Sequence, residues 1–247
     1  MILSRHTQRP STSTGTPRRT LLRAALAGTA ATAGVTLAVP SAGATVTRPT
    51  STRPATPEQA LHELSEGNKR WRTFRQQHPH ENATVRQSLV TGQHPFAVVL
   101  GCIDSRVAPE LAFDQGLGDL MTVRSAGEVL DEAVLGSIAY GVLELEIPLV
   151  LVLGHQSCGA VAAAVEADET GERLPSHIQY LADQIKPAID HTQQGDARVD
   201  ATVSANVKMI RSRLAAEPDL AARVSTGKLA IVGARYELAN QLVHQIA

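Results

Sequence analysis

Cysteine is scarce in this sequence. Only two occur among 247 residues, Cys102 and Cys158, so the chain can form at most one disulfide bond. The shortage makes the neighbours of each cysteine informative. Asp104 and Arg106 follow the first cysteine, and His155 lies three residues before the second. The sequence thus surrounds its two thiols with an acid, a base and an imidazole.

Long apolar runs and an excess of basic residues are also missing. The most extended apolar stretch, residues 24–39, has about 16 residues, fewer than the roughly 20 of a membrane-spanning helix. No later stretch is long enough, so we expect no membrane span in the rest of the chain. Residues 1–44 carry five arginines and no acids, which leaves 18 basic against 24 acidic residues, a formal charge of −6. This charge argues against nucleic acid as a partner.

Residues 1–44 are typical of an export leader. A polar start leads through the adjacent Arg18 and Arg19 into the apolar stretch and ends at Ala42-Gly43-Ala44, a small-x-small cleavage pattern. The paired arginines before a mild apolar segment favour a twin-arginine signal peptide. An ordinary secretory leader and a single membrane anchor are the alternatives. We therefore expect an exported protein, periplasmic or secreted.

The 203 residues that follow the leader suffice for one domain with a sizeable core. Residues 45–57 are rich in Thr and Pro and predict a flexible linker. Residues 58–247 are expected to form the domain. It begins with an amphipathic helix over residues 58–75, whose apolar stripe carries Leu61, Leu64, Trp71 and Phe74. This stripe indicates core packing, on the same chain or on a partner chain.

The domain alternates predicted strands and helices. Short apolar runs predict strands at residues 95–102, 119–127, 148–155 and, as the last strand, 228–236. Asp131 can cap a helix over residues 132–146, and further helices are expected at 158–168 and about 176–193 and 199–216. This alternation predicts an α/β fold, with a mainly parallel central sheet flanked by helices and an N-terminal helical arm.

Cys102, His155 and Cys158 form a candidate metal site. Cys102 ends the first predicted strand and His155 ends the third, and the carboxyl ends of parallel strands meet at one edge of a sheet. Two thiolates and an imidazole suit zinc, and a set of three protein ligands leaves a fourth position open, as in catalytic sites. A disulfide bond, or a buried cysteine beside a core histidine, is the alternative. His78 and His80 predict a surface loop and no second metal site.

Two motifs resemble those of the β-class carbonic anhydrases. They are CIDSR at residues 102–106 and GHQSCGAV at 154–161, and the likeness extends over residues 58–247. The resemblance implies one zinc ion per chain, held by Cys102, His155 and Cys158. It also implies a catalytic dyad of Asp104 and Arg106.

The resemblance implies a lyase that reversibly hydrates carbon dioxide to bicarbonate and a proton. Zinc lowers the pKa of its bound water, and the zinc-bound hydroxide attacks the carbon. The usual example of this effect is itself a carbonic anhydrase, whose three-histidine site differs from the present ligands. In the family, an aspartate such as Asp104 accepts a hydrogen bond from the hydroxide or takes the fourth position itself. An arginine such as Arg106 holds that aspartate away, although without the zinc motif the same two residues would form only a weak surface ion pair.

Three further positions bear on the resemblance. Glu128 stands where many relatives have asparagine, in a loop near the site. Val99 stands where members with an inhibitory bicarbonate pocket have tryptophan, which argues against that pocket here. Arg124 matches an arginine that lines the pocket, and a salt bridge within the fold would equally explain it.

Two other functions stay open at the level of sequence. An enzyme on the same scaffold could hydrolyse carbonyl sulfide or carbon disulfide through the same zinc chemistry. A catalytically silent zinc-binding or disulfide-bonded interaction protein is disfavoured, because a dead site has no use for the Asp104–Arg106 pair. The resemblance also implies at least a homodimer, since relatives commonly lay the N-terminal helix across a partner subunit.

We predict export of the folded, zinc-loaded protein. Thiolate ligands would risk oxidation if the chain crossed unfolded into an oxidising compartment. Replacement of both Arg18 and Arg19 by lysine should therefore trap the protein in the cytoplasm, as measured by cell fractionation. Normal export of this double variant would instead indicate a general secretory leader.

Overall fold

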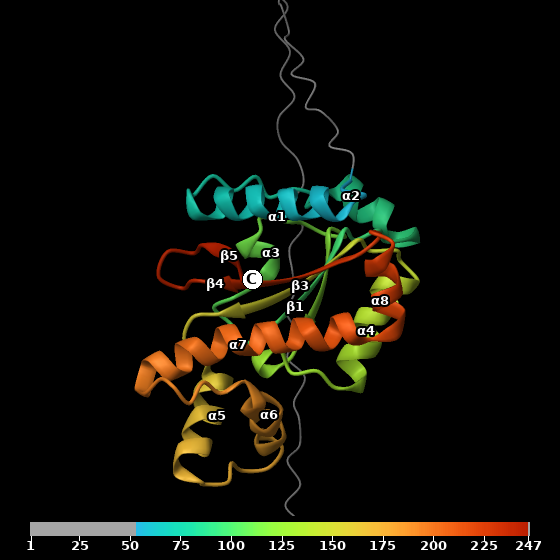
Figure 1. Cartoon of the computed structure of the whole chain (residues 1–247). Coiled ribbons are helices and arrows are strands. Elements are labelled where there is room, and N and C mark those ends of the chain that lie inside the picture. The colour runs from blue at the N-terminus through green and yellow to red at the C-terminus, as the bar shows by residue number, and fades with distance from the viewer. Residues whose placement is uncertain (1–52, 247) are drawn as a thin grey trace, which may run out of the picture. The chain divides into compact units, whose positions relative to one another are not determined.

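The computed structural model describes residues 53–246, so the predicted leader and most of the predicted linker lie outside the described residues. The centre is a five-stranded sheet with the order β2-β1-β3-β4-β5 (Figure 1). The first four strands pair in parallel and β5 pairs antiparallel to β4. The strands are β1 (Ala97–Gly101), β2 (Leu120–Arg124), β3 (Leu149–His155), β4 (Ala230–Tyr236) and β5 (Val243–Ile246). The predicted α/β fold with a mainly parallel sheet is confirmed.

Helices flank this sheet. They are α1 (Pro57–Arg72), α2 (Ala83–Ser88), α3 (Pro109–Ala112), α4 (Glu132–Leu143), α5 (Gly159–Thr170), α6 (Ile178–Ile185), α7 (Gly195–Ala216) and α8 (Pro218–Ser225), with short 3-10 turns η1 (Leu89–Thr91), η2 (Ala126–Glu128) and η3 (Lys186–Ala188). Asp131 caps α4 as predicted, because its side chain accepts a hydrogen bond from the Val134 N–H at 2.8 Å. Figure 1 shows α1 along one side of the sheet and α7 along the other.

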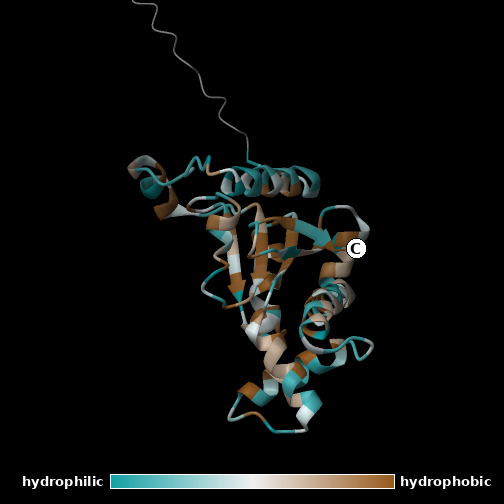
Figure 2. Cartoon of the chain, turned by 90° about the vertical axis from the view of Figure 1, so that its left-hand side faces the viewer, coloured by the Kyte–Doolittle hydropathy of each residue, from teal (hydrophilic) through white to brown (hydrophobic). Residues whose placement is uncertain are grey.

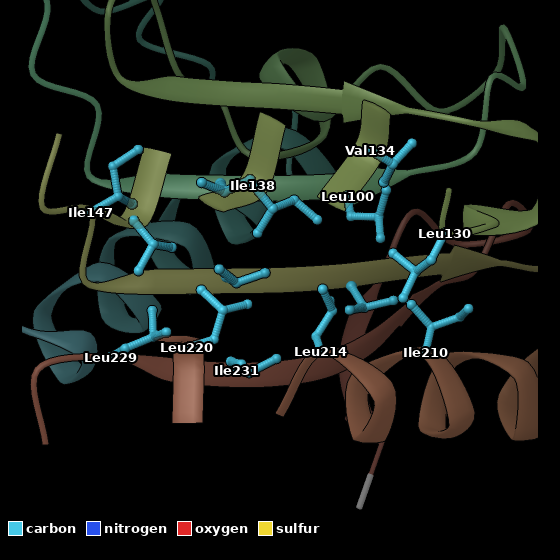
Figure 3. Close-up of a cluster of buried hydrophobic side chains, with 14 of the residues drawn as sticks. Leu100, Leu130, Val134, Ile138, Ile147, Ile210, Leu214, Leu220, Leu229 and Ile231 are labelled. Atoms are coloured by element: carbon cyan, nitrogen blue, oxygen red, sulfur yellow. The ribbon is translucent and has the colours of Figure 1, made fainter. Parts of the chain in front are cut away.

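The alternating side chains of β1 and β3 fill two separate cores. Val98 and Leu100 of β1 face α4, α7 and α8, in a cluster with Ile138, Ile210 and Leu214 (Figure 3). On the opposite face, a second cluster joins the sheet to α1 and α3; its members on β1 and β3 are Ala97, Val99, Leu149, Leu151 and Leu153. Because both faces are covered, these strands are apolar except where β3 ends at His155, and Figure 2 shows the central strands mainly in hydrophobic colours.

The N-terminal helix α1 packs on its own chain. Thr56 caps the helix and Pro57 opens it. Leu64 is buried against the sheet, and Trp71 donates a hydrogen bond from Nε1 to the Tyr236 hydroxyl at 3.1 Å. Phe74 does not belong to the packed stripe, since the helix ends at Arg72 and the Phe74 side chain is 84% exposed.

Three predictions for the carboxyl-terminal part of the chain were wrong. The strand at 228–236 is not the last one, because the short β5 follows it; β5 is exposed at the sheet edge and lacks a continuous apolar run. The predicted helix at 176–193 stops at Ile185, where Pro187 introduces the turn η3. The predicted helix at 199–216 begins earlier, at Gly195, and α8 follows it.

The close contact between α1 and the loop at Phe113 can be tested by substitution of Gly67. A Cβ atom at Gly67 would lie 1.7 Å from the Phe113 carbonyl oxygen. Gly67→Ala should therefore lower the free energy of unfolding by roughly 1–3 kcal/mol, measured by chemical denaturation. Gly136→Ala on α4 is the matched control, because a Cβ there meets nothing within 4 Å and alanine favours a helix by up to about 1 kcal/mol. Equal effects of the two substitutions would contradict this packing.

Candidate metal centre

The sheet brings the three predicted metal ligands together. Cys102 follows the last residue of β1, His155 ends β3, and Cys158 caps the start of α5. Parallel pairing places Gly101 beside Leu153, so both strands leave the sheet at the same edge. The ligand atoms of the three side chains lie within 4.8 Å of one another, and all three residues are buried.

The geometry of the two sulfurs fits a metal rather than a disulfide. The Sγ atoms of Cys102 and Cys158 are 3.9 Å apart, and both cysteines are free. Two sulfurs bound at about 2.3 Å to one tetrahedral zinc lie about 3.8 Å apart, whereas a disulfide bond requires about 2.05 Å. The spacing therefore matches two thiolates that share one zinc ion.

The imidazole is oriented for the same metal. The Nδ1 atom of His155 lies 2.9 Å from the Gln156 carbonyl oxygen, a contact that requires the proton on Nδ1 and leaves Nε2 with a free lone pair. Nε2 is buried and has no hydrogen-bond partner within the described residues. A buried polar atom without a partner is costly, and a metal ion bound between Nε2 and the two sulfurs would satisfy it. The donor set thus fits zinc.

The two thiols differ in acidity because they contact each other. Hydrogen bonding from Cys158 lowers the pKa of Cys102, with further help from the Gly127 N–H, and these effects outweigh burial. The same hydrogen bond and burial raise the pKa of Cys158. Cys102 is therefore the thiol that loses its proton first.

Asp104 and Arg106 form a bidentate pair beside the ligands. Arg106 donates from Nε to Oδ1 at 2.9 Å and from Nη2 to Oδ2 at 2.7 Å. These hydrogen bonds hold the pKa of the Asp104 carboxyl well below its usual range, although burial opposes them. The carboxylate also approaches the ligand set, since Oδ2 lies 3.9 Å from the His155 Nε2. A second contact of Arg106, from Nη2 to the Ser157 carbonyl oxygen at 3.2 Å, links the loops that carry Cys102 and Cys158.

Arg124 forms no salt bridge within the described residues, contrary to one of the two sequence-based interpretations. Its guanidinium donates to the carbonyl oxygens of Cys102, Asp104 and Val107 at 2.6–3.0 Å. One side chain from the neighbouring strand β2 therefore fixes the loop that carries Cys102 and Asp104. The sequence could not predict these contacts, because every residue has a backbone carbonyl and the residue types therefore do not show which carbonyls an arginine will bind.

Glu128 is buried behind Cys102. It lies in the left-handed region, with φ 54°, and its side chain accepts a long hydrogen bond of 3.5 Å from Asn206 Nδ2. Burial, and then the nearby Cys102, raise its pKa well above the ordinary value. Asn206, on α7, was not identified from sequence, because it lies 79 and 78 residues from Gly127 and Glu128, the residues it contacts.

The geometry agrees with comparisons against known proteins. The carbonic anhydrase family model matches residues 97–243. Carbonic anhydrase 2 of Mycobacterium tuberculosis is 43% identical over 184 residues, which cover 74% of this chain and 89% of that protein. The carbonic anhydrase of Mycolicibacterium smegmatis is 42% identical over 186 residues, with 74% and 90% covered.

Solved structures show the same fold. The Coccomyxa β-carbonic anhydrase in complex with acetazolamide aligns with a TM-score of 0.62 at 24% identity, covering 75% of this chain and 86% of that one. A tetrameric β-carbonic anhydrase from Sordaria macrospora aligns with a TM-score of 0.62 at 20% identity, covering 76% and 96%. The chain belongs to the β-class carbonic anhydrase family and is an enzyme of that type. No helix within residues 53–246 is both long and apolar enough to cross a bilayer.

Removal of Arg124 should loosen the loop at 102–107. Arg124→Gln shortens the side chain and removes the four hydrogen bonds that the guanidinium donates to the loop. The backbone N–H groups of Arg106 and Val107 should therefore exchange hydrogen about tenfold faster or more. Hydrogen exchange measured by NMR checks this. Arg198→Gln is the control, since Arg198 bonds Gln193 and Glu169 on other elements. Unchanged exchange in the Arg124 variant would contradict the positioning role.

Proposed function

We propose that the chain is a zinc lyase that interconverts carbon dioxide and bicarbonate with release of a proton. The observation that carries the proposal is the convergence of Cys102, His155 and Cys158 beside the Asp104–Arg106 pair. Relatives named carbonic anhydrases that cover most of this domain support it.

Each ligand has a defined part in holding the metal. Cys102 and Cys158 would bind as thiolates and His155 through Nε2, while the Gln156 carbonyl keeps the imidazole in the correct tautomer. Zinc, when bound, lowers the pKa of a coordinated water so that a nucleophile forms at accessible pH. Three protein ligands leave the fourth position to that water.

Asp104 would orient the nucleophile by accepting its hydrogen bond. Arg106 uses both carboxylate oxygens of Asp104, which keeps the carboxylate from occupying the fourth metal position itself. Because Arg106 lowers the pKa of Asp104, the carboxylate is ionised at every pH above its lowered pKa. A loss of activity between about pH 9 and pH 6 would therefore reflect protonation of the nucleophile rather than of Asp104.

The ligand charge sets the direction of the pH dependence. Two thiolates neutralise the charge of zinc and donate more electron density than imidazoles, so the bound water should be less acidic than in a three-histidine site. Activity should consequently rise through the alkaline range.

We predict that Arg106→Ala lowers kcat by about tenfold or more while zinc is retained, because the arginine restrains Asp104 without binding the metal. Asp104→Ala should also retain zinc and lose activity. Alanine at Cys102, His155 or Cys158 should strip the metal or the activity. The measurement is a pH–rate profile of carbon dioxide hydration for each variant, with its metal content.

Undiminished turnover of Arg106→Ala, or a flat wild-type profile from about pH 6 to 9, would rule out this mechanism.

The same assay should include carbonyl sulfide and carbon disulfide. All three gases would use the same nucleophile, and only the shape of the pocket would separate them. A clear preference for either sulfur-containing gas would replace carbon dioxide as the proposed substrate.

We also propose a homo-oligomer and export. The tetrameric Sordaria relative supports assembly, and the exposed Phe74, Ile103 and Leu111 on the described chain offer apolar surface for it. Export rests on the twin-arginine pattern of residues 1–44, outside the described residues.

Light scattering at micromolar concentration should show at least twice the mass of one chain, because burial of these exposed apolar side chains favours association. The full sequence has a mass of 26.2 kDa. A mass at or below this value would contradict the assembly.

A further inference from the structure

The peptide segment behind Cys102 has an unusual conformation. Within η2, Gly127 and Glu128 are both left-handed, with φ of 64° and 54°. This region is unfavourable for a residue such as glutamate and persists only when the surroundings hold it. The Gly127 N–H donates a hydrogen bond to the Cys102 Sγ at 3.4 Å. The strained segment thus directs a backbone donor at one of the candidate metal ligands.

A side chain from a distant helix holds this segment. Asn206 of α7 is fully buried and donates from Nδ2 to the Gly127 carbonyl oxygen at 2.8 Å. From the other side, the Ile185 side chain packs so closely that a Cβ on Gly127 would lie 2.7 Å from its Cδ1. Gly127 therefore lies between an apolar contact and a single polar anchor.

A contribution to folding stability alone does not explain why asparagine occupies position 206. Asn206 Oδ1 and Glu128 Oε1 are buried without a hydrogen-bond partner in the part of the chain that is described. Each unsatisfied buried atom costs about 1–3 kcal/mol, whereas an apolar residue of the same size would avoid this cost. Asparagine at this position gains a short hydrogen bond to the Gly127 carbonyl oxygen and a long one to Glu128 Oε2. Of these two partners, Gly127 is the one whose N–H donates to the Cys102 sulfur.

We propose that Asn206 is a positioning residue of the metal centre, holding Gly127 so that its N–H stays on the Cys102 sulfur. This inference rests on the proposed zinc function. A hydrogen bond to a thiolate withdraws electron density from the sulfur and orients it, as contacts behind metal ligands generally do. The contact would offset part of the strong donation of the two thiolates, and by holding the sulfur in position Asn206 would stabilise the bound metal.

The test compares Asn206→Leu, which keeps the volume and removes the donor, with the smaller Asn206→Ala. Thr202→Val is the matched control. Thr202 is also fully buried, one turn earlier on α7, but its hydroxyl accepts a hydrogen bond from the Asp190 N–H and forms none with Gly127 within the described residues. Each full-length protein is assayed for zinc affinity by competition with a chromophoric chelator. The thiolate-to-metal charge-transfer band of the cobalt(II)-substituted protein supplies a second reading.

Both Asn206 variants should bind zinc about 10- to 100-fold more weakly, and their charge-transfer bands should move to longer wavelength because the sulfur becomes more electron-rich. Thr202→Val should match the wild type in both readings. Folded Asn206 variants with wild-type affinity and an unshifted band would overturn the inference, as would loss of fold in both. A wild-type protein that does not bind zinc, or Cys102→Ala with undiminished affinity, would instead overturn the proposed function on which it rests.

Discussion

The register between two buried parallel strands is the constraint on which the site depends. Gly101 of β1 pairs with Leu153 of β3, so Cys102 and His155 reach the same edge of the sheet, and the turn after β3 adds Cys158 at the start of α5. A slip of one residue would turn the side chains of a strand to the opposite face. Close packing opposes such a slip, because each side chain moved to the opposite face would have to fit a core filled around a different side chain.

A second layer of contacts then holds the candidate metal ligands that lie at the ends of the strands. Arg124 of β2 binds three carbonyl oxygens in the loop after Cys102, and Arg106 connects that loop to Ser157. Asn206 of α7 reaches the Gly127 peptide that donates to the Cys102 sulfur. Metal ligands with neighbours held from several elements keep their geometry more rigidly than ligands on loops alone. The fold therefore sets the positions of the candidate ligands and also supplies the hydrogen bonds that hold them there.

The sequence predicted those features that depend on local residue patterns. The buried strands appear as apolar runs, Asp131 appears as a helix cap, and the motifs place Cys102 and His155 at strand ends. Features that depend on tertiary contacts could not be read in this way. The edge strand β5 has no continuous apolar run, and the partners of Arg124 are backbone carbonyls. Asn206 was missed because nothing near it in sequence marks it, and Phe74 was misassigned because the helical periodicity continues beyond the residue where α1 ends.

The central claim is that two sulfurs and one imidazole hold a zinc ion whose fourth position is open to a light atom. X-ray absorption spectroscopy at the zinc edge of the purified protein tests it most directly. The account predicts two sulfur scatterers at about 2.3 Å and two nitrogen or oxygen scatterers at about 2.0–2.2 Å, one of them with the outer-shell pattern of imidazole. A zinc shell without sulfur, a shell of four sulfurs, or protein with no zinc and a Cys102–Cys158 disulfide would contradict it.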